Sequence, residues 1–534
     1  MRRPARAGSA EVAARGFEPS TCVWRARLGH AGTLQAWLRV AGTARAWRRL
    51  ARASRSWRTL AGALLVAGCA QAPPPKLPEV AVPASFREVA PWTAAEPADE
   101  LPREAWWRLF GDARLDALQQ RLVERSPDLA AAYARYEQAR AATDQALALQ
   151  SPTLNANLGV RRDQQSELRP LRVLSATSPD RYSTGTLGLG LDYEVDLWGR
   201  VKSQVEAGVA LGQAAEADLA TARLVLQAQL ADSWVALRGL DREAVLLRDF
   251  EDALGRALGV VERRHAGGIA SGLDLARAQG QLESTRSQAR QSAAQRAVLE
   301  HAIAALVGEP ASDFAIAPEP AELPLLRVPV GLPSTLLQRR PDIAAAERRV
   351  AAANASVGVA RAAFFPAVML SAQGGYQSSD LARFIRAPNI FWSIGPSLVA
   401  NLFDGGRRKA EEARVLAVLD ESGARYRGVV IAAFQQVEDN LALLDRYGAA
   451  AESEGRAVAA AQRSLELANA RYREGAASYL EVVTSQTAAL QAQRSALDLA
   501  TRQRRAGVQL IRALGGGWSA ADLGADWSRR TAPP

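Results

Sequence analysis

Two long stretches of the chain repeat their apolar residues at helical spacing. Successive apolar positions lie three, four or seven residues apart, and in the first stretch they are Leu219, Leu226, Leu230, Leu237, Leu240, Leu247, Leu254, Leu258 and Val261. In the second stretch they are Val415, Leu419, Tyr426, Val430, Phe434, Val437, Leu441 and Leu444. This spacing places the side chains along one stripe of a helix, as in a helix-packing seam. If the first helix is nearly continuous from 199 to about 262, its ~64 residues reach roughly 95 Å at 1.5 Å each.

The distribution of proline supports the same interpretation. The chain has 26 prolines, yet residues 180–309 and 397–532 contain none. Proline breaks helix interiors because it lacks a backbone donor, so its exclusion predicts long helices. Glycines at 267, 268 and 475 end these helices, and residues 272–308 and 478–514 then return as alanine- and glutamine-rich helices. The two stretches are therefore predicted to form two long helical hairpins.

Each hairpin is preceded by two segments in which apolar and polar residues alternate, which is the period of a strand. In the first half the apolar positions are Leu154, Ala156, Leu158 and Val160, then Leu187, Leu189, Leu191, Tyr193, Val195 and Leu197. In the second half they are Val368, Leu370 and Ala372, then Trp392, Ile394, Leu398, Ala400 and Leu402, with Pro396 interrupting. Polar loops at 163–183 and 378–390 separate the strands. A half-buried sheet in a soluble domain is the alternative interpretation.

The two halves are an internal duplication. The run Pro127-Asp128-Leu129-Ala130 recurs from Pro341, at an offset of 214, and Pro152 matches Pro366 at the same offset. The segment from His265 to Asp274 matches the segment from Tyr472 to Glu481 at an offset of 207. Units of about 200 residues are too long for solenoid repeats. They are expected to be the two halves of one pseudo-symmetric protomer.

The number of strands predicts how many copies of the chain assemble. Four strands cannot close a barrel, and an open sheet edge cannot lie in lipid. Three copies would supply twelve strands, an even number within the range of outer-membrane barrels. Crosslinks between the strand at 152–161 and the strand at 391–403 are expected to join neighbouring chains. The pattern therefore predicts a homotrimer, with the long helices as the staves of a tube; a helix bundle inside one chain is the alternative.

The N-terminal residues have the layout of a secretory signal. Arg52, Arg55 and Arg58 precede a short apolar run that is far too short to span a bilayer. The run ends in Leu65-Val66-Ala67-Gly68-Cys69, which resembles a bacterial lipobox, in which the cysteine is acylated and becomes the first mature residue. Cys69 is therefore the expected lipidation site. A plain signal peptide with an incidental Cys69 is the alternative.

Removing this leader changes the charge of the chain. Residues 1–68 hold 13 Lys and Arg against 2 Asp and Glu, a net of +11, whereas the whole chain carries +10. The mature chain then has 53 basic and 54 acidic residues, close to −1. The excess of basic over acidic residues lies in the leader, so nucleic acid is not expected as a partner. No cysteine follows Cys69, which excludes an intramolecular disulfide and a thiolate metal site.

Catalytic chemistry finds no support in the sequence. The mature chain has two histidines, His265 and His301, and neither has a second histidine at metal-motif spacing. The glycine-rich run at 185–190 lies in a strand pattern and opens no helix, so it is a poor nucleotide loop. We therefore expect no enzyme, no metal and no cofactor.

Several separated motifs resemble the outer membrane factors, the TolC-like channels of tripartite efflux pumps. The motifs are Tyr193-Glu194-Val195-Asp196-Leu197-Trp198-Gly199-Arg200, Arg340-Pro341-Asp342-Ile343, Ala360-Arg361-Ala362-Ala363-Phe364-Phe365-Pro366, Gly395-Pro396-Ser397 and Leu402-Phe403-Asp404-Gly405-Gly406-Arg407. The resemblance covers roughly 69–518, and the lipobox is similar to that of the OprM/NodT-type lipoproteins. It implies a membrane α+β fold: a twelve-stranded trimeric barrel in the outer membrane, a periplasmic helical barrel, and a mixed equatorial domain.

The resemblance also implies the organisation of the chain and its partners. The expected segments are a leader at 1–68, an N-terminal tether and equatorial segment at 69–126, a first repeat at 127–309, a Pro-rich connector at 310–340, a second repeat at 341–514 and a tail at 515–534. The expected partners are two further copies, outer-membrane lipid, a periplasmic adaptor and an inner-membrane transporter of RND type. The protein would be a passive exit duct for drugs and toxic small molecules. A type I protein-secretion channel and a non-conducting structural coiled-coil lipoprotein are the alternatives.

The helix reversals are the candidate functional sites. The adaptor is expected to dock at the periplasmic tip, on Gly268, Ser271, Leu273, Gly475, Ser478 and Leu480. Asp274 and Glu481 occupy matching positions of the two halves, so a trimer would carry six carboxylates around one constriction. Relatives commonly place an aspartate three residues further on, where this chain has Thr484, with Arg277 as its equivalent in the other half. Glu481 is the preferred gate residue; an outward-facing position for both carboxylates is the alternative.

Overall fold

A computed structural model describes residues 83, 86–89, 105–166, 181–326 and 338–523. The chain divides into two units, Met1–Gly68 and Cys69–Pro534, and all described residues belong to the second. The predictions for the leader and for Cys69 therefore lie outside the described residues. The same holds for most of the N-terminal tether, for 327–337 of the connector and for 524–534 of the tail.

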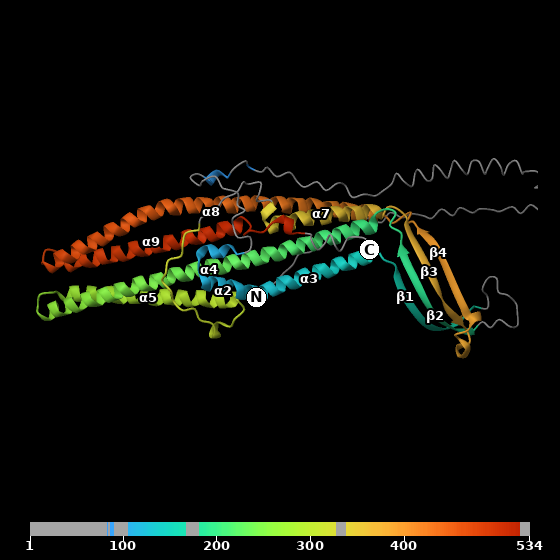
Figure 1. Cartoon of the computed structure of the whole chain (residues 1–534), viewed down its shortest axis with the longest axis horizontal. Helices are drawn as coiled ribbons and strands as arrows, with labels where there is room; N and C mark the ends of the chain where they lie inside the picture. Colours follow the sequence, from blue (N-terminus) through green and yellow to red (C-terminus); the bar gives the residue numbers. More distant parts are fainter. Residues whose placement is uncertain (1–82, 84–85, 90–104, 167–180, 327–337, 524–534) are drawn as a thin grey trace, which may run out of the picture. The chain divides into compact units, whose positions relative to one another are not determined.

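Two helical hairpins dominate the described part of the chain (Figure 1). The first consists of α4, Arg200–Ala266, and α5, Gly272–Leu306; the second consists of α8, Arg407–Arg473, and α9, Tyr479–Ala513. Both long helices have 67 residues and both returning helices have 35. The hairpins predicted from apolar spacing and missing proline are confirmed. Within the described ranges, no helix combines the length and the apolar character needed to cross a membrane.

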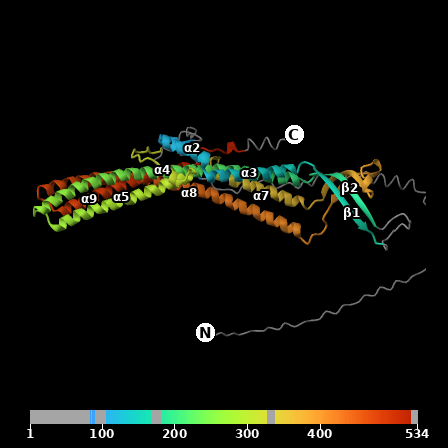
Figure 2. The ribbon, with the colours of Figure 1, turned by 90° about the horizontal axis from the view of Figure 1, so that it is seen from below.

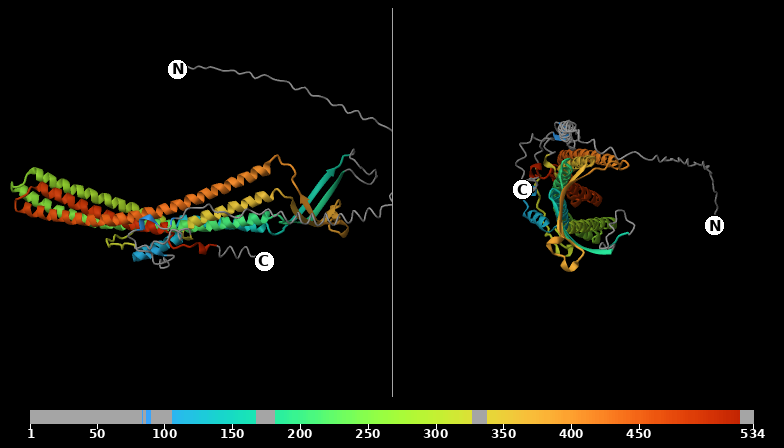
Figure 3. Two further views of the ribbon diagram at one scale, coloured as in Figure 1. Left: turned by 90° about the horizontal axis from the view of Figure 1, so that it is seen from above. Right: turned by 90° about the vertical axis from the view of Figure 1, so that its right-hand side faces the viewer.

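Two shorter helices, α3 at Pro127–Ala148 and α7 at Pro341–Ala362, open the two halves. Each has 22 residues and begins with proline, which suits the first helical turn because the amide hydrogen that it lacks would be unpaired there. Helix α3 packs on α4, α4 on α7, and α7 on α8 (Figure 2). Seen from the sheet end, these helices follow an open arc (Figure 3).

One four-stranded antiparallel sheet lies at the end of these helices. Its strands are β1, Thr153–Gln164; β2, Arg181–Glu194; β3, Ala367–Ser378; and β4, Ile390–Val399, in the spatial order β1-β2-β3-β4. The two halves thus meet at β2 and β3, and β1 and β4 are the free edges.

The ends of two strands differ from the prediction. Strand β4 runs through Pro396 as one strand and ends at Val399, whereas the pattern continued it to Leu402. An edge strand tolerates proline, because the donor that it lacks can lie on the unpaired side. Ala400 and Leu402 lie beyond β4, and β2 ends three residues before Leu197.

The main core lies where the smaller elements cross the middle of the long helices. These elements are η1, Arg87–Val89; η3, Trp106–Phe110; α2, Ala113–Arg125; η4, Ala311–Asp313; and η7, Ala520–Asp522, while η5, Leu381–Arg383, and η6, Ala387–Asn389, join β3 to β4. Trp234 of α4 is fully buried in this core and donates from Nε1 to Asp112 Oδ2 at 3.0 Å. Asp112 also caps α2, accepting from the amides of Arg114 and Leu115. One carboxylate thus fixes α2 against α4.

Each returning helix ends in the same way. Gly308 follows α5 with φ +77°, and Gly515 follows α9 with φ +95°. A Cβ on Gly308 would lie 2.4 Å from the carbonyl oxygen of Arg125, and a Cβ on Gly515 would lie 2.0 Å from that of Arg339. Only glycine combines the left-handed backbone with so close an approach. The two contacts fix the end of each hairpin against the segment that leads into α3 or α7.

Candidate functional site

The sheet presents one apolar face. In the register of the structure, Leu158 pairs with Leu187, Leu191 with Ala372, and Ala372 with Ile394. The outermost strands expose this face most, with Leu158 at 77% and Trp392 at 73% of their full accessible area. The opposite face carries small and polar residues such as Asn157. An exposed apolar face opposite a polar one is the pattern of a barrel that separates lipid from an aqueous lumen.

The turns at the far ends of the two hairpins have the same backbone. In the first turn the amides of Gly268 and Ile269 donate to the carbonyls of His265 and Arg264, at 2.9 and 2.8 Å. In the second turn the amides of Gly475 and Ala476 donate to the carbonyls of Tyr472 and Arg471, at 3.2 and 2.8 Å. Gly268 and Gly475 both have positive φ, +70° and +79°. The two reversals predicted from glycine are thus equivalent turns.

Apolar side chains are exposed at these turns. Leu273 and Leu480 hold matching positions at the start of α5 and α9, and both are exposed. Ile269 is 79% exposed. Ser271 caps α5, since its hydroxyl oxygen accepts from the amide of Asp274 at 3.1 Å, whereas Ser478 makes no side-chain cap. Exposed apolar side chains on a rigid turn suit contact with a partner protein.

The two turns are joined inside one protomer. The Arg264 guanidinium lies 4.7 Å from the centre of the Tyr472 ring, and it donates to the carbonyls of Tyr472 and Arg473 at 3.4 and 3.5 Å. The Tyr472 ring lies 5.3 Å from that of Tyr479. Val261 and Ala278 of the first hairpin pack in the same buried cluster as Tyr479. Burial raises the pKa of Tyr479 to about 12, with smaller contributions from Tyr472 and Asp274.

Each predicted gate carboxylate has an arginine partner. Asp274 accepts from the Ser271 hydroxyl at 2.8 Å and lies 3.8 Å from Arg277. Glu481 lies 3.2 Å from Arg471, which is in the last turn of α8. No pattern in the sequence identifies Arg471 as this partner, since its contact with Glu481 depends on how the turn folds back.

The third predicted gate residue, Thr484, is uncharged. Thr484 donates to the carbonyl of Leu480 at 2.9 Å, within its own helix. The roles of Glu481, Asp274 and Thr484 in a constriction stay predictions.

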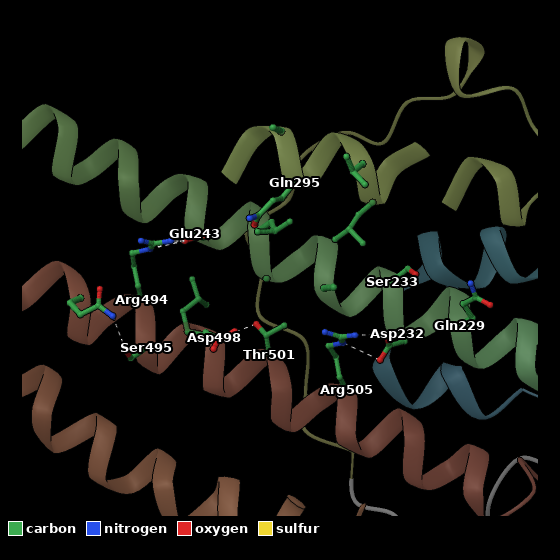
Figure 4. A pocket seen from close by; sticks show the side chains of 18 residues that line it. Gln229, Asp232, Ser233, Glu243, Gln295, Arg494, Ser495, Asp498, Thr501 and Arg505 are labelled. Atoms are coloured by element: carbon green, nitrogen blue, oxygen red, sulfur yellow. Dashed lines mark hydrogen bonds and ion pairs between the residues drawn. The ribbon is translucent and has the colours of Figure 1, made fainter. Parts of the chain in front are cut away.

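A cavity of about 970 Å³ lies between α4, α5 and α9, midway along the hairpins (Figure 4). Its charged groups are largely paired: Arg494 of α9 contacts Glu243 of α4 at 2.6 Å, and Arg505 of α9 contacts Asp232 of α4 at 2.8 Å. These ion pairs tie the second hairpin to the first. The lining contains no histidine or cysteine that could act as a nucleophile or base.

The two histidines within the described residues, His265 and His301, stand apart from each other. His265 bonds through Nδ1 to the carbonyl of Ala270 at 2.9 Å, which holds the first turn, and His301 is exposed on α5. Among the residues that the structure describes, no three His, Cys, Asp or Glu side chains come together as a metal site.

Known proteins share both the sequence and the fold. The pattern of the family described as outer membrane efflux protein matches residues 118–309 and 332–516. The pyoverdine export outer membrane protein OpmQ of Pseudomonas aeruginosa is 35% identical over 459 residues, which cover 85% of this chain and 95% of OpmQ. The cation efflux system protein CusC of Escherichia coli O157:H7 is 30% identical over 465 residues, 85% of this chain and 97% of CusC. The solved outer-membrane channel OprN superposes with a TM-score of 0.78 at 29% identity, covering 84% of this chain and 100% of OprN.

Proposed function

The chain belongs to the outer membrane efflux protein family, and from this premise we propose that an adaptor of the pump docks at its hairpin tips. The resemblance drawn from its motifs is confirmed. The protein is an outer-membrane efflux channel, with a trimeric barrel of four strands per chain that continues into a long helical barrel in the periplasm. The predicted fold class, function and location are thereby confirmed. The partner proteins, the cargo and the site residues are proposals.

Adaptor docking is supported by the shape and chemistry of the tips. The sheet and the helix reversals lie at opposite ends of the described part (Figure 1), so the end farthest from the membrane is the end with the two turns. Leu273 and Leu480 are exposed there on two equivalent turns. A trimer would present six such turns in a ring. Gly268, Ser271, Gly475 and Ser478 complete each turn and leave its backbone open to a partner.

The cargo is proposed to be small molecules that the inner-membrane transporter selects. OpmQ is named for pyoverdine and CusC for cations, two chemically unlike cargoes, and both resemble this chain at 30–35% identity. A channel scaffold common to such different cargoes leaves selection to the pump. We propose an RND-type transporter as that pump. The duct itself is passive.

The docking proposal has a direct test in cells. Gly268→Arg and Gly475→Arg each place a long charged side chain at a turn, where its bulk obstructs a partner and the positive φ strains the turn backbone. The matched control is Gly455→Arg, on the exposed surface of α8 far from the turn, with open space around its Cβ. Efflux is measured as drug accumulation in cells that express the cognate adaptor and pump, and trimers are quantified in the outer membrane.

The expected result is loss of efflux in both turn variants with trimer levels unchanged, while Gly455→Arg exports normally. Normal efflux in both turn variants would refute docking at the tips. A separate measurement tests the duct: purified trimers should conduct ions in planar bilayers. A trimer without conductance would instead fit a structural coiled-coil lipoprotein.

A further inference from the structure

The connector between the two halves contains an extended segment that crosses the long helices. Residues 316–326, called the strap below, form neither helix nor strand and contain three prolines, at 318, 320 and 324. A proline has no amide donor, and it keeps the residue before it extended. The polar backbone groups of the strap are therefore available to side chains of the helices that it crosses.

The first half of the strap is bound firmly to the first hairpin. Asp241 of α4 has a side chain that is 1% exposed, and its carboxylate accepts from the amide of Glu319 at 2.9 Å and from Arg296 Nε of α5 at 2.7 Å. Arg296 also donates to the carbonyl of Ile316, and Glu300 of α5 accepts from the amide of Ile316, both at 2.6 Å. A buried carboxylate requires partners for its charge, and the strap backbone supplies one of them. The strap is thus a fixed part of the first hairpin.

The second hairpin is joined to the strap through one arginine. Arg504 of α9 is buried, and its Nε donates to the carbonyl of Leu323 at 2.6 Å. Its guanidinium also pairs with Glu322, whose carboxylate lies 3.2 Å from Arg242 of α4. Burial lowers the pKa of Arg504 below its ordinary value, and the charge of Glu322 opposes that shift. Glu322 therefore joins α4 to α9 through the strap.

The strap also packs on α9 about one turn after Arg504. Leu326 is buried, and a Cβ on Gly507 would lie 3.5 Å from the Leu326 Cβ. Because Gly507 has no side chain, the strap lies close to the backbone of α9. The strap therefore contacts α9 at the helical turn 504–507.

The internal duplication does not explain the charges that bind the strap. The offset of 207 relates α4 to α8 and α5 to α9. At this offset the counterparts are uncharged: Gly448 for Asp241, and Gln503 for Arg296. These charges belong to one half only, so they serve the strap rather than the packing that both halves share.

Next to the strap, α9 borders a cavity instead of a packed core. The cavity of about 970 Å³ lies between α4, α5 and α9, and its lining includes α9 side chains between 491 and 505. Arg505 of α9 pairs with Asp232 of α4 at 2.8 Å (Figure 4). Close packing supplies many small dispersion contacts, and a cavity removes them. The position of this part of α9 therefore depends on polar contacts more than on packing.

We propose that the strap holds α9 against the first hairpin and so limits the separation of the two hairpin tips. In the arrangement of the structure Arg504 reaches Glu322 and Leu323, whereas an α9 that moved away from α4 would lose both contacts. Contacts that are present in one state only shift the equilibrium towards that state. The proposal rests on a channel that conducts ions, and it adds the residues that restrain the opening of that channel.

Removal of the arginine tests the proposal. Arg504→Met keeps an apolar side chain and removes both polar contacts. The matched control is Arg502→Met, since Arg502 is exposed and pairs with Asp498 of its own helix at 2.7 Å. Single-channel recording of purified trimers gives the open probability. The ratio of open to closed channels should rise about tenfold in Arg504→Met, which corresponds to about 1.4 kcal/mol, and should keep its wild-type value in Arg502→Met.

A disulfide provides the opposite perturbation. Leu326→Cys with Gly507→Cys places two Cβ atoms 3.5 Å apart, at the short end of the range that a disulfide spans. Oxidised channels should open less often than wild type, and reductant should restore their opening. Each single-cysteine variant carries one of the two packing changes without the link, so its opening should not respond to reductant. The natural Cys69 is common to all of these proteins.

A purely structural role and a restraining role give different results. If Arg504 only stabilises the fold, Arg504→Met should lower the melting temperature and leave the open probability unchanged. Unchanged opening in Arg504→Met and in the oxidised disulfide variant would overturn the proposal, as would equal opening in Arg504→Met and Arg502→Met. If Arg504→Met does not form trimers, the disulfide variant decides. Wild-type trimers without conductance would refute the proposed duct and the restraint together, whereas unchanged opening of a conducting channel refutes the restraint alone.

Discussion

The link between the two hairpin turns predicts how firmly the two hairpins of one protomer are held together at the tip. Arg264 is the only residue for which the described structure gives both a hydrogen bond and a ring contact from the first turn to the second. Arg264→Ala removes a cation–π contact worth about 0.5–1 kcal/mol at an exposed site. It also removes two long hydrogen bonds to Tyr472 and Arg473, at 3.4 and 3.5 Å, which contribute about 0.5 kcal/mol together at this length. The loss is about 1–1.5 kcal/mol for each protomer.

This loss should favour separation of the hairpins. If the protomers open independently, the ratio of open to closed tips should rise about tenfold in each, since 1.4 kcal/mol corresponds to one factor of ten. If the three open together, the energies add and the ratio should rise by roughly a factor of a thousand. The assay is single-channel recording of purified trimers in planar bilayers, with open probability as the readout. Arg264→Lys keeps the charge but loses the planar stack, so its effect should be intermediate.

The matched control is Arg263→Ala, which removes the same charge one residue away. Arg263 is exposed, and the described structure gives it no hydrogen bond or ring contact with the second hairpin. If the two alanine variants show the same open probability, the effect is one of tip charge and the reasoning about the link is refuted. Wild-type behaviour in Arg264→Ala would refute it as well.

Four further predictions address other parts of the chain. Cys69→Ser behind an ordinary signal peptide should slow targeting yet leave a working channel, and mass spectrometry of the wild type should find acyl chains on Cys69. Gly515→Ala should destabilise the detergent-solubilised protein by about 2 kcal/mol or more, whereas Gly428→Ala, in an open helical position, should stabilise it by about 0.5–1 kcal/mol; thermal melts by circular dichroism compare the two. Glu481→Ala should raise single-channel conductance and weaken cation preference, and unchanged values would place the gate elsewhere. The pKa of Tyr479 is raised to about 12 from 10.0, so the neutral phenol stabilises the tip below pH 10 and that stability should be lost as pH rises from 10 to 12; Tyr479→Phe should abolish this pH dependence of melting.

Local patterns in the sequence were enough to predict the elements of the fold. Apolar spacing from Leu219 to Val261 predicted α4, since a helix stripe needs only the periodicity of its own segment. Alternation from Leu154 to Val160 predicted β1 for the same reason. The repeated motifs, at offsets of 214 and 207, predicted two equivalent halves, and the strand count predicted three copies. Each of these predictions uses only the order and spacing of residues along the chain, and the sequence contains all of that information.

Contacts between distant segments needed the tertiary structure. The arginine partner of Glu481 and the ring that Arg264 covers depend on how two turns pack, which no local period encodes. The sequence pattern continued β4 to Leu402, whereas the single chain ends it at Val399, because a strand extends only where a neighbour pairs with it. The pairing of β2 with β3, with Leu191 opposite Ala372, was likewise decided by packing. Sequence by itself determined which elements form and that they repeat; the tertiary structure decided which of them meet, since hydrogen bonds and ion pairs join residues far apart in the chain.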